Sequence, residues 1–115
     1  MAIRVLQCPI SLEEIGRLAQ EQFGDFVKAV VDVERGVVAI GGELHADEEA
    51  ILLEKGSRQS DLWGINIYPD RSEEERVEFD SMINIRPSEN NRTRGVEDLT
   101  VQSKIREIVE RNISA

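Results

Sequence analysis

The sequence predicts an α+β fold: a single domain over residues 1–115, in αββαββα order, with a four-stranded, mainly antiparallel sheet and its helices packed on one face. Three segments carry apolar residues at helical spacing, and the strand-like segments come in two consecutive pairs. Strands joined by short links pair in antiparallel fashion. The 115 residues are about one domain's worth of chain.

The composition limits the partners of the chain. It has 14 Lys and Arg residues against 23 Asp and Glu residues, a net charge of −9. Such a surface repels nucleic acid and anionic lipid, so we expect no nucleic acid and no membrane as partners. Pro9 with Glu13 and Glu14 interrupts any signal-peptide core. Because Cys8 is the single cysteine, we expect no internal disulfide and a cytoplasmic location.

The first predicted helix has the clearest boundaries. Ser11 and Glu14 form a capping box at its start, and Gly24 is a good terminator. Its apolar side chains recur at helical spacing and predict one buried face, made of Leu12, Ile15, Leu18, Ala19 and Phe23.

A hairpin and a second helix follow. Residues 26–33 and 37–40 are rich in β-branched side chains and predict two strands, and Gly36 suits the tight turn between them. Asp47 is the expected N-cap of the second helix, which ends before Gly56. The expected buried face of this helix is Ala50, Ile51, Leu53 and Leu52.

The second half of the chain alternates before it returns to a helix. Residues 63–68 and 77–86 alternate between apolar and polar side chains and predict two strands, with Trp63 in the core. A polar loop over 87–95 leads to a last helix, for which Asp98 is the expected N-cap. The sheet face away from the helices is expected to be open and polar, with Asn66, Tyr68, Asp80, Asn84 and Arg86 on it.

Three blocks of the sequence, 41–47, 61–69 and 82–87, resemble a family of small soluble proteins that is classed as a domain of unknown function. The resemblance covers nearly the whole chain and implies a stand-alone domain. It implies no activity, ligand or site residues.

The acidic stretch 43–49 contains the single histidine of the chain and is the first candidate site. Glu43 and His45 could act as general acid and base, because histidine titrates near neutral pH and a neighbouring carboxylate orients its ring. In an extended chain Glu43, His45 and Asp47 project to one side, as metal ligands would. A second histidine is absent, and negative charge is usual at a helix start, so we predict no metal site and no cofactor.

A basic loop is the second candidate site. Arg86, Arg92 and Arg94 fall within nine residues of an acidic chain, and guanidinium groups bind carboxylate or phosphate in two-point fashion. The alternative is that these arginines pair with carboxylates of the chain, with Arg86 reaching Glu43 or Asp47. The remaining ligand candidates lie on the polar sheet face: Asn66, Tyr68 and Asn84.

Two functional interpretations remain open. The first is a small binding or interaction module without its own chemistry, which forms a homodimer through the open sheet face. The second is a small hydrolase or transferase for an anionic substrate, metal-assisted or not, with His45 and Glu43 as acid–base pair and the three arginines as anion clamp. The two differ in whether Glu43, His45, Asn84 and Arg86 converge on one pocket.

Overall fold

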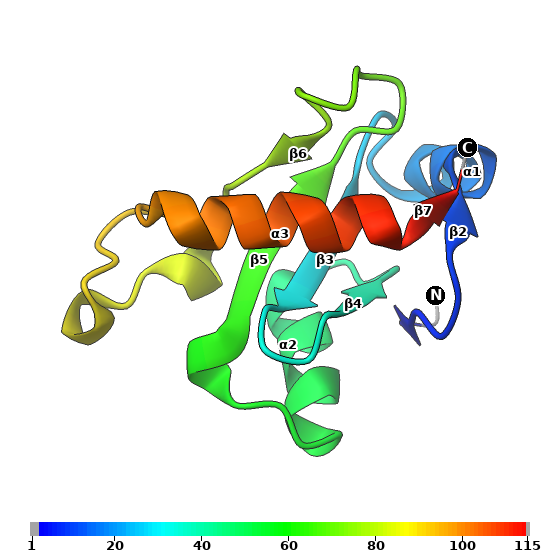
Figure 1. Cartoon of the computed structure of the whole chain (residues 1–115). Coiled ribbons are helices and arrows are strands. Elements are labelled where there is room, and N and C mark those ends of the chain that lie inside the picture. Colours follow the sequence, from blue (N-terminus) through cyan, green and yellow to red (C-terminus); the bar gives the residue numbers. More distant parts are fainter. Residues whose placement is uncertain (1–2, 115) are drawn as a thin grey trace.

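The computed structural model describes residues 3–114, and within them the chain forms three α-helices around a central antiparallel sheet (Figure 1). This confirms the predicted α+β class. The helices are α1 (Leu12–Gln22), α2 (His45–Glu54) and α3 (Leu99–Arg111). The sheet has the order β1-β4-β3-β5-β6, with β1 (Arg4–Val5), β3 (Val27–Asp32), β4 (Val37–Ile40), β5 (Leu62–Ile67) and β6 (Val77–Glu78).

The sheet has five strands where the sequence predicted four. The additional strand is β1, which pairs with β4 over two residues. The predicted strand 77–86 is much shorter, because only Val77 and Glu78 pair with β5. Beyond them Ser81 caps a short 3₁₀-helix, η2 (Met82–Asn84), by accepting a hydrogen bond from the Ile83 amide. A capping serine thus ends an alternation that otherwise looks like a strand.

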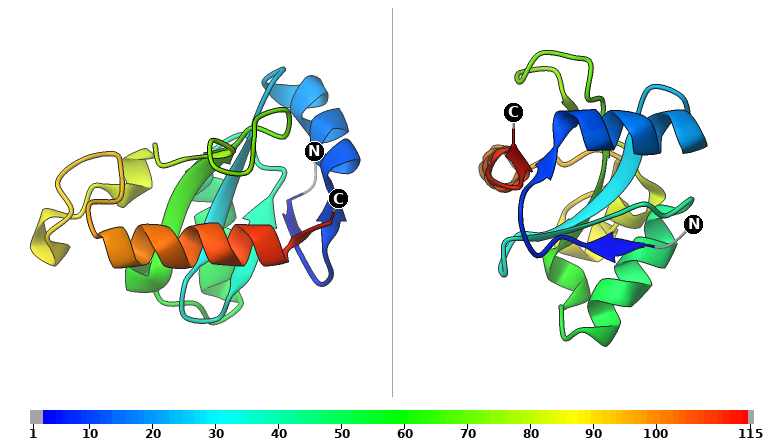
Figure 2. Two further views of the ribbon diagram at one scale, coloured as in Figure 1. Left: turned by 45° about the horizontal axis from the view of Figure 1, so that its top comes forward. Right: turned by 90° about the vertical axis from the view of Figure 1, so that its right-hand side faces the viewer.

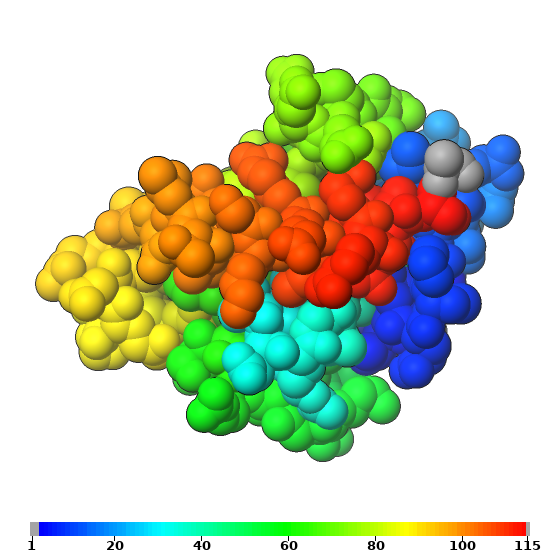
Figure 3. Space-filling view, viewed as in Figure 1, coloured from blue at the N-terminus to red at the C-terminus, as the bar shows by residue number. Residues whose placement is uncertain are grey.

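Four further short elements complete the fold of residues 3–114. Strands β2 (Ile10–Ser11) and β7 (Ile113–Ser114) pair in parallel, beside the start of α1 and the end of α3. Two more 3₁₀-helices, η1 (Gln59–Asp61) and η3 (Pro87–Glu89), lie before β5 and after η2. The segment that contains η2 and η3 projects at one end of the molecule, coloured yellow in Figure 3.

Helices cover both faces of the sheet, which corrects the prediction that all of them pack on one face (Figure 2). Helices α1 and α3 pack on one face, where Ile15 and Ile105 join a large apolar cluster with Val31 and Trp63. Helix α2 packs on the other face, where its Leu52 joins a smaller cluster made of Val30, Ala39 and Leu62. The expected core position of Trp63 is confirmed.

The local signals at the helix ends are mostly confirmed. Ser11 accepts a hydrogen bond from the Glu14 amide at the start of α1, and Asp98 does the same for Thr100 at the start of α3. Gly24 and Gly56 follow α1 and α2 with positive φ angles of 98° and 101°. Such angles are the usual reason for glycine at a helix end.

The start and the buried face of α2 differ from the prediction. The helix begins at His45, two residues before the expected N-cap Asp47, and its N-cap residue is Leu44, which provides no side-chain cap. Its buried residues are His45, Glu48 and Leu52, whereas Ala50 and Leu53 are exposed. Hydrophobic periodicity missed this face because two of its three buried side chains are ionisable. In residues 3–114, no helix has the length and apolar character needed to cross a membrane.

Candidate functional site: a pocket at the start of helix α2

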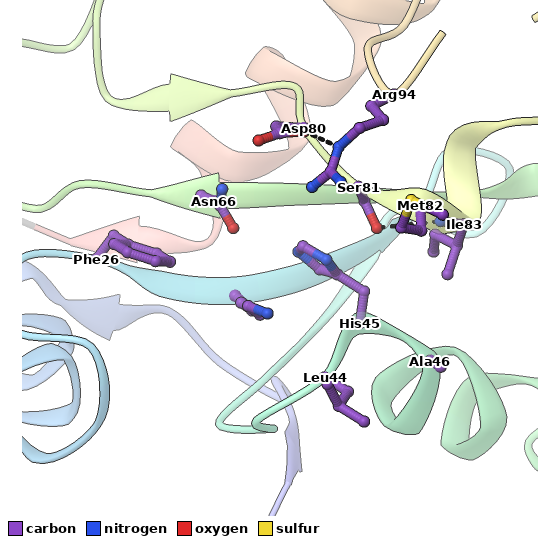
Figure 4. Close-up of a pocket in the computed structure, with 11 residues that line it drawn as sticks. Phe26, Leu44, His45, Ala46, Asn66, Asp80, Ser81, Met82, Ile83 and Arg94 are labelled. Carbon is purple, nitrogen blue, oxygen red and sulfur yellow. Dashed lines mark hydrogen bonds and ion pairs between the residues drawn. The ribbon is translucent and has the colours of Figure 1, made fainter. Parts of the chain in front are cut away.

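A pocket of about 340 Å³ lies on the α2 face of the sheet, next to the N-terminal end of the helix (Figure 4). Helix α2 covers the part of this face around Val30 and Leu62, and the part beyond the helix start stays uncovered. Strands β3 and β5 form the floor, and the chain after β6 forms one wall. We call this the α2 pocket; its lining is Phe26, Lys28, Leu44, His45, Ala46, Asn66, Asp80, Ser81, Met82, Ile83 and Arg94.

His45 stands at the boundary between the helix and the pocket. Its Nε2 lies 2.7 Å from the backbone carbonyl oxygen of Ile65. A carbonyl oxygen only accepts, so Nε2 carries the proton and Nδ1 is an acceptor in the neutral ring. Burial lowers the pKa of the imidazole below its ordinary value of 6.5, which keeps the ring neutral at pH 7. His45 therefore offers a lone pair on Nδ1.

Gly64 allows His45 to approach β5 this closely. A Cβ at position 64 would lie 2.6 Å from the Ser81 side chain and 3.2 Å from Cγ of His45. Any larger residue at position 64 would push the Ser81 and His45 side chains away from the strand. His45 and Ser81 consequently contact the same point of the strand from two different segments (Figure 4).

A row of polar residues crosses the floor of the sheet. Lys28 of β3 is paired with Asn66 of β5, which is paired with Glu78 of β6. Nδ2 of Asn66 donates to the Glu78 carboxylate over 2.8 Å. Oδ1 of Asn66 is buried and has no hydrogen-bond partner among residues 3–114. Figure 4 shows this oxygen on the side of His45. The pocket floor thus contains an acceptor that the protein does not use.

The rim of the pocket combines an ion pair with apolar side chains. The Arg94 guanidinium donates to the Asp80 carboxylate, and both side chains are substantially exposed. Leu44 and Met82 are apolar side chains at the pocket mouth with 55% and 65% of their surface exposed. A small molecule in the pocket therefore meets polar groups at the floor and apolar groups at the rim, the usual composition of a ligand site.

Glu48 lies one helical turn from His45, on the buried face of α2. Its Oε2 accepts a hydrogen bond of 3.0 Å from the Gly42 amide, and its Oε1 is buried without a partner in the part of the chain that the structure describes. Burial raises the pKa of this carboxyl from 4.5 to about 9, so the group is protonated at neutral pH. Glu48 therefore adds no negative charge beside the pocket.

Of the predicted site residues, the α2 pocket brings together His45, Asn66 and Arg94. Glu43 is exposed and does not line the pocket. Tyr68 lies outside the lining as well, with its hydroxyl donating to Glu78 and its ring 5.2 Å from that of Phe26. Burial and the bond to Glu78 raise the pKa of the Tyr68 hydroxyl.

Asn84 and Arg86 lie away from the pocket lining, in a cluster that we call the Asn84 junction (Asn84, Arg86 and Asn91). The Asn84 amide bonds both backbone groups of Gly64, accepting over 2.9 Å and donating over 3.0 Å, so it takes the place of a strand partner. Arg86 donates to the carbonyl oxygens of Gln59 and Leu62. Burial lowers the pKa of its guanidinium.

The three arginines do not form one clamp. Arg86 is buried in the junction, Arg94 pairs with Asp80, and the side chain of Arg92 is exposed. The expected bond from Arg86 to Glu43 or Asp47 is not formed, because the guanidinium binds backbone carbonyls instead. The convergence that would support the predicted acid–base pair with an anion clamp is therefore absent from residues 3–114.

The structure adds pocket residues that the sequence reasoning did not select, namely Lys28 and Ser81. Lys28 is the single cation of β3, whose other charged residue is Asp32 at the strand end. A lone cation within a run of apolar residues was the available signal. Ser81 gave no such signal, because its role depends on the glycine it faces in β5. Across the described chain, no group of three or more His, Cys, Asp or Glu side chains is placed to hold a metal ion.

The chain belongs to a known protein family. A family model described as "Protein of unknown function (DUF5674)" matches residues 4–112, which is nearly the whole sequence. The resemblance read from the three sequence blocks is thereby confirmed at the level of a domain of unknown function. No curated protein and no solved structure shows a significant match to this chain.

Proposed function

We propose that this protein is a small-molecule-binding domain and that the α2 pocket is its binding site. The observation that carries the proposal is the buried Oδ1 of Asn66, which the protein leaves without a partner at the pocket floor. An unsatisfied buried oxygen costs on the order of 1–3 kcal/mol. A ligand that supplies an N–H or O–H group removes this cost on binding, so the floor favours the bound state.

Binding without catalysis has more support than the hydrolase or transferase alternative. That alternative needs Glu43 beside His45, and Glu43 is exposed outside the pocket lining. Ser81 is a candidate nucleophile near His45. Its Oγ is engaged in capping η2, and no hydrogen bond joins it to His45 in the part of the chain described. A nucleophile and its base normally lie within hydrogen-bond reach.

The proposal keeps the predicted cytoplasmic setting and the predicted homodimer. The exposed free thiol of Cys8 supports a reducing compartment. Leu44 and Met82 at the pocket rim supply exposed apolar surface for a second copy of the chain. Such a dimer would use the rim rather than the whole sheet face, because α2 covers the rest.

The test is a titration of the protein with a panel of small carboxylic acids, amides and nucleosides, followed by backbone amide chemical shifts. We expect shifts at residues 44–46, 66 and 80–83 for at least one class of compound. Ala46→Trp should abolish these shifts, because Ala46 is an exposed residue of the lining and the larger side chain would fill the pocket. Ala50→Trp is the matched control, one turn further along α2 and outside the lining. Shifts that survive in Ala46→Trp, or a panel without any binder, would show that the proposal is wrong.

A further inference from the structure

We infer that the ligand of the α2 pocket is a small organic carboxylate that carries a hydroxyl or N–H donor next to a short apolar group. This inference rests on the proposed function and adds the chemical class of the ligand. Three independent features of the pocket carry it: two unused acceptors, an excess of cationic groups, and an apolar rim.

The two unused acceptors select a ligand with hydrogen-bond donors. Oδ1 of Asn66 is buried without a partner, and the Asn66 residue is only 7% exposed. Nδ1 of His45 is the second acceptor, since Nε2 donates to the Ile65 carbonyl oxygen, directly beside Asn66 in β5. Figure 4 shows both side chains facing the same space. A hydroxyl or amine N–H placed there satisfies either acceptor, whereas a second carbonyl oxygen satisfies neither.

The charge of the lining selects an anion. Lys28 and Arg94 line the pocket with only one carboxylate, Asp80, which Arg94 already binds. Lys28 forms no ion pair within residues 3–114, and its ammonium instead lies 5.1 Å from the centroid of the Phe23 ring. The pocket is therefore locally cationic in a chain with a net charge of −9.

The neighbouring carboxylates of Glu43 and Glu78 lie outside the pocket lining. The Glu78 carboxylate accepts hydrogen bonds from Asn66 Nδ2 and from the Tyr68 hydroxyl. Glu48 is protonated at neutral pH because of its burial. Helix α2 also begins at the pocket, because Leu44, His45 and Ala46 belong to the lining. Its N-cap residue, Leu44, provides no side-chain cap. Free amides at a helix start attract an anion.

The rim accounts for the apolar part of the ligand and for its size. Phe26, Leu44, Met82 and Ile83 surround the polar floor. A volume of about 340 Å³ holds a ligand with a single ring or a short branched chain. These features distinguish an organic carboxylate from inorganic phosphate, which has no apolar part.

Mandelate and two analogues separate these features on the wild-type protein. Mandelate has the carboxylate, the hydroxyl and an apolar ring; phenylacetate lacks the hydroxyl, and methyl mandelate lacks the charge. We expect calorimetry to show that each analogue binds about tenfold more weakly than mandelate, a typical loss for one polar interaction. Inorganic phosphate should bind more weakly than mandelate.

Two variants assign the interactions to residues. In Lys28→Met the preference for mandelate over methyl mandelate should disappear, and in Asn66→Leu the preference over phenylacetate should disappear. Lys104→Met, which removes an exposed lysine of α3, is the control and should leave both preferences unchanged.

The outcomes separate the ligand class from the proposed function. If methyl mandelate, phenylacetate or phosphate binds as tightly as mandelate, or if the only binders in the wider panel are uncharged, the inferred class is wrong and the pocket remains a binding site. If no compound of the panel binds, or if binding survives in Ala46→Trp, the proposed function is wrong as well. Because the ligand series uses the wild-type chain, these results do not depend on whether a variant folds.

Discussion

The Asn84 junction and the α2 pocket lie along the same strand, β5. Each contains a buried asparagine: Asn84 of the junction bonds the backbone of this strand, and Asn66 of the pocket belongs to it. Asn84 uses its carbonyl oxygen and both amide hydrogens, on the two backbone groups of Gly64 and on the Arg94 carbonyl oxygen. Asn66 donates a hydrogen bond from its amide nitrogen to Glu78, and its carbonyl oxygen accepts none within residues 3–114.

The difference shows how buried polar groups of one fold divide between architecture and binding. In the junction, backbone groups saturate both asparagine side chains, and Asn91 bonds four backbone groups around the loop that follows. Arg86 forms no hydrogen bond through Nε or Nη2, but its Nε lies 4.0 Å from the Glu89 carboxylate and its guanidinium stacks on the Trp63 ring. In the pocket the polar groups of Asn66 and His45 remain available. Saturated groups stabilise the fold, and unsaturated groups that line a pocket are free for a ligand.

The largest expected effect comes from the same substitution made at both asparagines. Asn84→Ala leaves the Gly64 amide and the Gly64 carbonyl oxygen without the bonds that Asn84 supplies, and the Arg94 carbonyl oxygen keeps only its bond from the Ser81 amide. We therefore expect the free energy of unfolding to fall by about 3–5 kcal/mol. Asn66→Ala should cost about 1 kcal/mol or less, since it loses one bond and removes an unsatisfied oxygen. Urea denaturation measures both. Equal losses would remove the distinction between the two regions.

Arg86→Met is the next largest test. It removes two hydrogen bonds to backbone carbonyls and the stacking on Trp63, and we expect a loss of about 2–4 kcal/mol in unfolding free energy. Arg94→Met serves as the control, because its ion pair with Asp80 is exposed and contributes about 1 kcal/mol at most. Ligand binding should be retained in Arg86→Met. A stable Arg86→Met protein that no longer binds carboxylates would move the anion site to the junction.

Glu48 is intermediate between the saturated side chains of the junction and the unsaturated ones of the pocket. One of its carboxyl oxygens accepts a hydrogen bond, and the other has no partner within residues 3–114. Its pKa is raised from 4.5 to about 9 in the folded protein, so its contribution to stability is fully present below pH 4.5 and is lost as the pH rises toward 9. Glu48→Gln cannot ionise and should be about 2–3 kcal/mol more stable than the wild type at pH 7.

The pH dependence provides the check on Glu48. Unfolding free energies of the wild type and Glu48→Gln should coincide near pH 4 and separate as the pH rises. A difference that stays constant between pH 5 and pH 8 would contradict a protonated carboxyl at this position.

The smallest effect on folding is expected at the pocket rim. If the predicted homodimer covers Leu44 and Met82, sedimentation at micromolar concentration should give twice the chain mass, and Met82→Glu should weaken the dimer. Leu99→Glu is the control, since Leu99 is 73% exposed on α3, at the other face of the sheet. A monomer at high concentration would end the dimer prediction and leave the pocket proposal unchanged.

The elements of the fold that depend on local signals were predictable from the sequence. Ser11, Asp98 and Gly24 act within one turn of chain, and their roles hold in the structure. The buried face of the second helix was predicted correctly at Leu52 and wrongly at Ala50 and Leu53. Its other two buried side chains, His45 and Glu48, bond the backbone of Ile65 in β5 and of Gly42. A pattern of apolar residues cannot report such contacts.

The candidate site was predictable only in part for the same reason. His45, Asn66 and Arg94 were selected by residue type, but their convergence depends on the point at which the chain leaves β6. That point is set by the Ser81 cap and by the Asn84 amide, which replaces a strand partner. Both act across segments of the chain, so alternation within residues 77–86 carried no sign of them.

The position of Trp63 has a practical consequence for spectroscopy. It is the single tryptophan of the chain, its ring lies 4.0 Å from the Arg86 guanidinium, and it belongs to the apolar cluster on the face opposite the pocket. Its fluorescence therefore reports on the junction, and the sheet separates the Trp63 ring from the pocket. A ligand that fills the pocket should leave the emission maximum unchanged, and denaturation should shift it to longer wavelength. A spectral response to ligand would mean that the two regions communicate through β5.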